Sequence, residues 1–178
     1  MVPNLRDVAE SVELVAERPL LRPGLLFRGG TVNRLFDETE LPPIETILNL
    51  RKGPDRLFRG VVNLHHPAQD RKDNYLTSAS SVQRWLQEGL VKVTQARWPL
   101  LVHCTSGRDR TGVFIGLVLF VVGIEPSIIM DEYELSDGVT AGHRQLFAKS
   151  LDGFTAHQGW LVPELATALR RRLRLDEA

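Results

Sequence analysis

The chain has 178 residues, 43% of them hydrophobic, and its 22 lysines and arginines balance its 22 aspartates and glutamates. This composition excludes intrinsic disorder and the strong positive field typical of nucleic-acid-binding proteins, and the length allows a sizeable core. The single cysteine excludes an intramolecular disulfide and a four-cysteine zinc site, and it suits a reducing compartment. We therefore expect a single domain over residues 1–178, located in the cytoplasm.

Two segments bear on export and on membrane insertion. Residues 1–18 carry six charged side chains and lack the apolar core of a signal peptide. The most hydrophobic stretch, residues 113–124, is too short and too interrupted by glycine to span a bilayer. We expect a soluble protein without stable membrane insertion.

Short apolar runs bounded by turn residues predict the strands. In chain order they are residues 25–28, 44–50, 61–64 and 100–102. A short helical start is expected at residues 37–41, and a polar loop follows the third strand over residues 65–74.

Helical spacing of apolar residues dominates the second half of the chain, over residues 82–93, 112–122, 126–135 and 160–175. Thr77 or Ser78 is expected to cap the first of these helices, and Pro126 suits the start of the third. Strands alternating with helices predict an α/β fold, with a central and mainly parallel sheet flanked by helices. In such folds the active residues gather at the carboxyl ends of the strands.

The loop between the last strand and the buried helix carries the chemistry, and it reads His103-Cys104-Thr105-Ser106-Gly107-Arg108-Asp109-Arg110-Thr111. A loop that joins a strand to a helix N-terminus gathers unpaired N–H groups and the positive end of the helix dipole, which together bind anions. Cys104 begins the loop, where its thiolate is stabilised. Arg110 follows six residues later, where its guanidinium can bind two oxygens of a phosphate. A buried and inert cysteine, the usual alternative, leaves the surrounding pattern without an explanation.

The remaining loop residues have supporting roles in this interpretation. The residues that form the phosphate-binding loop are Thr105, Ser106, Gly107, Arg108, Asp109 and Arg110. Gly107 allows the backbone geometry that a tight ring of N–H groups needs. The Thr111 hydroxyl is expected to donate to the sulfur, and His103 to point away from the substrate and hold the loop by hydrogen bonds. Attack by the thiolate predicts a cysteinyl-phosphate intermediate that water hydrolyses, without a metal ion or other cofactor.

The pattern His103-Cys104-x5-Arg110-Thr111-Gly112 resembles the signature of the cysteine-dependent protein tyrosine and dual-specificity phosphatases. Further segments resemble landmarks of the bacterial tyrosine phosphatase branch, at residues 4–7, 21–28, 47–51 and 131–136. The resemblance covers most of the chain. It implies a phosphatase domain that acts on phosphotyrosine, and also on phosphoserine or phosphothreonine, in proteins. The expected partner is therefore a phosphorylated protein or small molecule, and not a nucleic acid.

Departure of the leaving group requires a proton, which a nearby carboxylic acid usually supplies. In dual-specificity phosphatases this acid is an aspartate on a loop upstream of the cysteine, and residues 67–70 look like that element. Asp70 is the first candidate and Asp73 its close rival. Asp109 is the third, although a carboxylate inside the loop opposes phosphate binding unless it points outward or pairs with a base such as Arg28 or Arg51.

Several alternatives stay open. Arg108 adds positive charge beside the pocket, as in lipid and inositol phosphate phosphatases, so a phosphoinositide or inositol polyphosphate phosphatase is the nearest rival. The residues that flank the loop disfavour a sulfurtransferase, and the lack of a second cysteine disfavours an arsenate reductase. A phosphate-binding pseudophosphatase would require Asp70 and Asp73 both to point away. His65 and His66 lack a third ligand at suitable spacing, so no metal site is expected.

Overall fold

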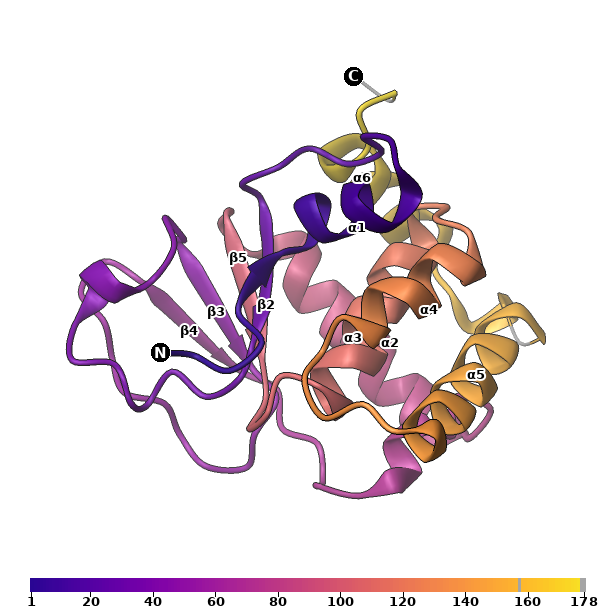
Figure 1. Ribbon diagram of the computed structural model, residues 1–178, viewed down its shortest axis with the longest axis horizontal. Helices are drawn as coiled ribbons and strands as arrows, with labels where there is room; N and C mark the ends of the chain where they lie inside the picture. Colours follow the sequence, from indigo (N-terminus) through magenta and orange to yellow (C-terminus); the bar gives the residue numbers. More distant parts are fainter. Residues whose placement is uncertain (157, 177–178) are drawn as a thin grey trace.

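We describe a computed structural model, which covers residues 1–156 and 158–176 (Figure 1). In this part of the chain, five strands form one sheet in the order β1-β2-β5-β3-β4. They are β1 (Arg6–Asp7), β2 (Leu26–Gly29), β3 (Thr46–Asn49), β4 (Val62–His65) and β5 (Leu100–His103). Neighbouring strands run parallel except β1, which is antiparallel to β2. The prediction of a central, mainly parallel sheet is confirmed.

The helices are α1 (Val8–Ala16), α2 (Ser80–Gln95), α3 (Asp109–Val121), α4 (Pro126–Glu134), α5 (Ala141–Ala156) and α6 (Pro163–Leu173). Short 3-10 helices lie at η1 (Glu38–Glu40), η2 (Lys72–Tyr75) and η3 (Gln158–Trp160). Figure 1 shows the long helices gathered on one face of the sheet. No helix in the described residues is both long enough and apolar enough to cross a membrane.

Each sheet face has its own core, because side chains alternate along a strand. Leu26, Leu48 and Leu100 point toward the helices and belong to the main core. Their neighbours Phe27, Ile47 and Leu101 point the other way, into a smaller core that residues of the connecting loops complete. Apolar side chains therefore pack against both faces of the strands that lead to the loops at the carboxyl edge of the sheet.

Helix α3 follows β5 directly and passes through the middle of the main core. Nearly all of its residues from Arg110 to Val121 are buried, which is expected of a helix that is apolar on all sides. A buried strand and a buried helix thus hold the two ends of the intervening loop in fixed positions.

The structure differs from the sequence predictions at the start of α2. This helix begins at Ser80 with Ala79 as its N-cap and without a side-chain cap, so the expected cap at Thr77 or Ser78 is wrong. The Thr77 hydroxyl is buried and donates instead to the carbonyl of Ser150 in α5, at 2.7 Å. A contact with α5 thus takes the hydroxyl that was expected to cap α2.

Candidate active site

The loop formed by residues 104–110, which we call the phosphate loop, connects the carboxyl end of β5 to the first turn of α3. Cys104 is a free cysteine and only 1% exposed. Gly107 has a φ of +76°, and a Cβ there would lie 2.5 Å from the carbonyl carbon of Gly29. Both the dihedral angle and the close approach require glycine, as the sequence indicated.

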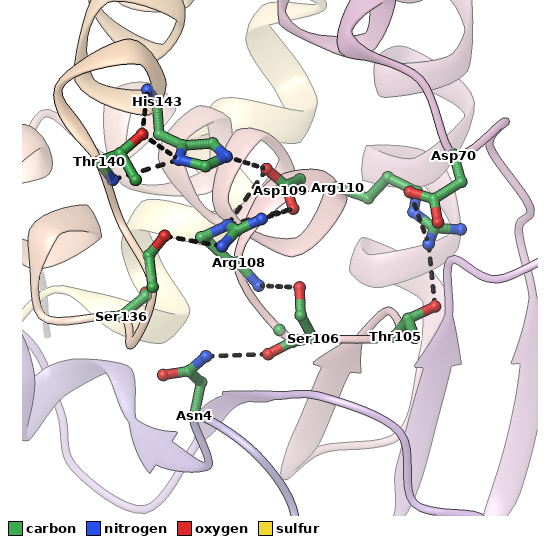
Figure 2. Close-up of polar contacts among 12 residues, drawn as sticks. Asn4, Asp70, Thr105, Ser106, Arg108, Asp109, Arg110, Ser136, Thr140 and His143 are labelled. Atoms are coloured by element: carbon green, nitrogen blue, oxygen red, sulfur yellow. Dashed lines mark hydrogen bonds and ion pairs between the residues drawn. The ribbon is translucent and has the colours of Figure 1, made fainter.

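Four successive carbonyl groups of the phosphate loop accept hydrogen bonds from donors outside it. The donors are His103 Nδ1 to Cys104 (3.0 Å), the Thr31 N–H to Thr105 (3.0 Å), Asn4 Nδ2 to Ser106 (2.9 Å) and Arg28 Nη2 to Gly107 (3.0 Å). Figure 2 shows Asn4 reaching Ser106 from the N-terminal segment. In a trans peptide group the N–H points away from the C=O, so the N–H groups of residues 105–108 turn to the opposite side. They form a nest of donors suited to an anion.

Arg110 lies at the end of this nest and is 3% exposed. Its Nη1 donates to the carbonyls of Leu50 (3.3 Å) and Ala68 (3.4 Å), and its Nη2 donates to the Thr105 hydroxyl at 3.0 Å. Its Nε is buried and has no hydrogen-bond partner among the described residues. Buried guanidinium donors without a partner are uncommon, and although Arg28 Nε is a second one in the described residues, the position of Arg110 at the end of the nest makes its open donor consistent with an anion site.

The structure separates the two main candidates for the general acid. Asp70 Oδ1 lies 3.2 Å from Arg110 Nη2, and its side chain is 74% exposed (Figure 2). It lines a cavity of about 180 Å³ together with Arg108 and His143. Asp73 lines a different cavity, between residues 67–69 and Trp85. Of these two carboxylates, Asp70 is the one that reaches the phosphate loop.

Asp109 points away from the nest and pairs with its neighbours. It accepts hydrogen bonds from Arg108 Nη2 (3.0 Å) and from the Tyr75 hydroxyl (2.7 Å), and it lies 3.7 Å from His143 Nε2. Burial alone would raise the pKa of Asp109, but the hydrogen bonds from Arg108 and Tyr75 outweigh it and hold the pKa below its usual range. An aspartate that stays ionised is a poor proton donor.

Asp109 thus pairs with a base, as one of the two alternatives required, but the base is Arg108 rather than Arg28 or Arg51. Arg28 is paired with Glu132, and Arg51 with Asp55, so neither guanidinium is available to Asp109. The base that it does use, Arg108, also donates to the carbonyl of Gly138 at 2.8 Å. Much of the hydrogen-bonding capacity of Arg108 is thus directed at the protein itself.

His103 lies behind the phosphate loop, fully buried, and both of its ring nitrogens face acceptors. Nδ1 is 3.0 Å from the Cys104 carbonyl, and Nε2 is 2.6 Å from Oδ2 of Asp55. A carbonyl can only accept, so Nδ1 is the donor in the first contact, and the Asp55 carboxylate holds the other side of the ring. Asp55 escaped the sequence analysis because it reads there as part of a surface turn, whereas its side chain is only 2% exposed.

Thr111 makes a different contact from the one expected. Its buried hydroxyl donates to the carbonyl of Gly29 at 3.4 Å, which ties the first turn of α3 to the end of β2. Within the described residues, no cluster of three or more histidine, cysteine or carboxylate side chains could hold a metal ion.

Comparison with known proteins gives one family and several relatives. Residues 1–174 match the family described as "Tyrosine phosphatase family". The triple specificity protein phosphatase PtpB of Mycobacterium tuberculosis is 25% identical over 226 aligned positions, which cover 96% of this chain and 79% of that protein.

Two solved structures are also similar. The core catalytic domain of the Saccharomyces cerevisiae PP-IP phosphatase SIW14 is 18% identical, with a TM-score of 0.49 over 80% of this chain and 94% of that one. Pseudomonas aeruginosa TpbA is 20% identical, with a TM-score of 0.48 over 83% of this chain and 84% of that one.

Proposed function

Because the chain belongs to the tyrosine phosphatase family, and is thus a hydrolase of phosphate monoesters, we propose that Cys104 is its nucleophile and Asp70 its general acid. The observation that carries this proposal is the outward direction of four successive carbonyls in the phosphate loop. It turns the N–H groups of residues 105–107 toward the side where the phosphate of a substrate would lie, together with the Arg108 N–H, which makes a long hydrogen bond to the Ser106 hydroxyl at 3.4 Å. Residues 1–178 act as a single phosphatase domain in this proposal.

In the first step, the N–H groups of the nest and the guanidinium of Arg110 bind the non-bridging oxygens of the phosphate. The Cys104 thiolate attacks phosphorus, the P–S bond forms, and the bond to the leaving oxygen breaks. Stabilisation by Arg110 is strongest as charge spreads over the transferring oxygens. Asp70 gives its proton to the leaving oxygen.

The ion pair between Asp70 and Arg110 supports this division of roles. The phosphate would take over the fork of Arg110, whose Nη2 now lies 3.2 Å from Asp70. The Asp70 carboxyl, largely exposed and released from Arg110, would then be able to turn toward the leaving oxygen. In the second step the Asp70 carboxylate accepts a proton from water, which attacks phosphorus and releases inorganic phosphate and the thiolate.

The substrate class we propose is phosphotyrosine in proteins, with phosphoserine and phosphothreonine also accepted. A phosphopeptide panel tests this range, and strict selectivity for phosphotyrosine would contradict its wider part. We place the enzyme in the cytoplasm, since a reducing compartment preserves a thiol nucleophile.

One observation favours a second candidate, a phosphoinositide or inositol polyphosphate. The cavity beside Asp70 is lined by Arg71, Lys72 and Arg108, and although Asp109 also lines it and pairs with Arg108, Arg71 and Lys72 leave positive charge beside the site. They suit a substrate that carries more than one phosphate. Faster phosphate release from inositol polyphosphates or phosphoinositide vesicles than from phosphopeptides would favour this candidate.

The proposal is tested by hydrolysis of para-nitrophenyl phosphate with a chelator present, comparing the wild type with Cys104→Ser. We expect the variant to lose turnover and to keep its affinity for inorganic phosphate, because the nest and Arg110 remain. Acid quenching of the wild type with [³²P]-labelled substrate should trap a protein-bound phosphate that Cys104→Ser lacks. Turnover by Cys104→Ser at the wild-type rate would refute the assigned nucleophile.

A further inference from the structure

A buried charge cluster lies behind the phosphate loop and has no part in the steps above. It consists of Arg28 in β2, Glu132 in α4 and Arg6 in β1. The side chains of Arg28 and Glu132 are 0% and 1% exposed, and Nη1 of Arg28 donates a short hydrogen bond to Oε2 of Glu132. A guanidinium without access to water requires a charged partner, so Glu132 both compensates Arg28 and sets its direction.

Glu132 is itself held from the other side. Its Oε1 accepts hydrogen bonds from Arg6 Nε at 2.9 Å and from the Ser11 hydroxyl at 3.2 Å. Two guanidinium groups thus share one carboxylate, and these three side chains together keep one net positive charge. In the weakly screening interior, a positive charge behind the loop attracts an anion bound in front of it.

Arg28 directs its second amino group at the phosphate loop. Nη2 donates to the carbonyl of Gly107 at 3.0 Å and to the hydroxyl of Ser136 at 3.3 Å. The Gly107 carbonyl shares its peptide group with the Arg108 N–H, so a donor that holds the oxygen also sets the direction of that N–H. Glycine leaves this peptide group more rotational freedom than any other residue would, and an outside contact is needed to select one orientation.

We propose that Arg28 is a positioning residue for phosphoryl transfer, and that Glu132 is the anchor by which α4 holds it in place. Arg28 touches neither the phosphate nor Cys104. It keeps the Gly107–Arg108 peptide turned with its N–H toward the nest, where that N–H makes only a long hydrogen bond to the Ser106 hydroxyl (3.4 Å) that a phosphate oxygen would replace, and its charge adds to the attraction. This gives a role to residues 131–136, a segment singled out in the sequence but unused by the mechanism. The inference rests on the proposed function, because the anion that the peptide faces is the substrate's phosphate.

The test compares Arg28→Lys with Arg6→Lys. Lysine keeps the charge, but its single amino group cannot span from Glu132 to the Gly107 carbonyl as the guanidinium fork does. We measure the inhibition constant for tungstate, an oxyanion that can occupy the site without reacting, together with kcat and KM for para-nitrophenyl phosphate. For Arg28→Lys we expect the inhibition constant to rise about tenfold and kcat/KM to fall by at least that factor.

Arg6→Lys is the matched control, because Arg6 contacts the same carboxylate but donates to no carbonyl of the phosphate loop. A purely structural role for the cluster predicts equal losses for both variants, in thermal midpoint and in tungstate affinity. Positioning predicts a clearly larger loss of tungstate affinity for Arg28→Lys. A cooperatively folded Arg28→Lys protein that binds tungstate as the wild type does would overturn the inference and leave the Cys104 chemistry standing.

If Arg28→Lys does not fold, a measurement on the wild type tests the positioning role of Arg28 instead. In protein labelled with [¹⁵N]arginine, the side-chain signals of Arg28 should shift on titration with tungstate, and more than those of Arg6. Unchanged Arg28 signals at saturating tungstate would overturn the inference. Tungstate binding that depends on Arg28, without any turnover by the wild type, would instead support the positioning role and refute the proposed reaction.

Discussion

The three aspartates near the phosphate loop, Asp55, Asp70 and Asp109, differ in the side chains that contact their carboxylates. Asp109 receives hydrogen bonds from Arg108 and Tyr75, and Asp55 is buried against His103. Asp70 is largely exposed and makes an ion pair with a guanidinium that a bound phosphate would claim. Of the three, it is therefore the one that we propose as the proton donor.

Replacing Asp70 with asparagine tests whether Asp70 is the general acid. We expect kcat for phenyl phosphate to fall by about 10²–10⁴, because its leaving group needs a proton. The loss should be smaller for para-nitrophenyl phosphate, whose leaving group is more acidic. Steady-state kinetics with the two substrates measure the difference. Asp73→Asn is the matched control, and a larger loss in that variant would move the acid to Asp73.

Replacing Asp55 with asparagine removes a charge but keeps an oxygen that can accept from His103 Nε2. We expect kcat/KM to fall by about tenfold, because the carboxylate that orients the imidazole behind the Cys104 carbonyl is lost. Glu45→Gln disrupts a surface pair with Arg97 and should change kcat/KM by less than about twofold. Equal effects in the two variants would show that Asp55 matters no more than a surface charge.

At the scale of helices and strands, the close packing of α3 against α5 leaves no room for a larger residue at Gly116 in α3. A Cβ at Gly116 would lie 2.8 Å from the end of the Phe147 ring, which is fully buried and cannot swing away. We expect Gly116→Ala to lower the free energy of unfolding by about 1–3 kcal/mol, despite the better helix propensity of alanine. Urea unfolding measures the change.

Gly142 offers the control for this prediction. It is exposed in the first turn of α5, and a Cβ there would meet the Thr140 hydroxyl at an ordinary 3.7 Å. Gly142→Ala should leave stability unchanged or raise it slightly. A stabilising Gly116→Ala would mean that the α3–α5 contact relaxes more readily than its geometry indicates.

The elements that could be predicted from the sequence are those with strong local signals. The strand β5 and the helix α3 have nearly continuous apolar runs, and β2, β3 and β4 have shorter apolar runs bounded by turn residues, whereas α5 contains glycines that weaken its helical pattern. One of them, Gly153, is required by tertiary packing, since a Cβ there would lie 2.1 Å from the Thr77 hydroxyl. The N-cap of α1, Asp7, was a local signal that the sequence analysis overlooked.

The residues of the site also fall into those that the sequence predicts and those that it does not. Cys104, Arg110 and the glycine at 107 follow from a contiguous motif, and the structure places them together. The partners that orient the loop do not follow from it, because Asp55 is 48 residues from His103 and Arg28 is 104 residues from Glu132. Only the folded sheet brings such residues into contact, so spacing along the chain gives no sign of them.

For the molecule as a whole, opposite charges balance, and the effect of pH on stability depends on individual buried groups. The pKa of Asp109 is lower in the folded protein than its usual value, so its ionised form stabilises the fold above about pH 4. This contribution is lost as the pH falls through the folded pKa. We expect the urea midpoint to drop between pH 5 and pH 2, and Asp109→Asn to reduce that dependence. Asp152→Asn, on the surface of α5, should preserve it.

The hydrogen bond between Asn4 and Ser106 joins residues 102 positions apart. Three of the four donors that hold the carbonyls of the phosphate loop, Asn4, Arg28 and Thr31, thus precede the loop by a long stretch of chain. A nascent chain that lacks β5 and α3 has no place to hold a phosphate ester, however much of its N-terminal half has been synthesised. The nest therefore forms only when both ends of these contacts are present in one folded sheet.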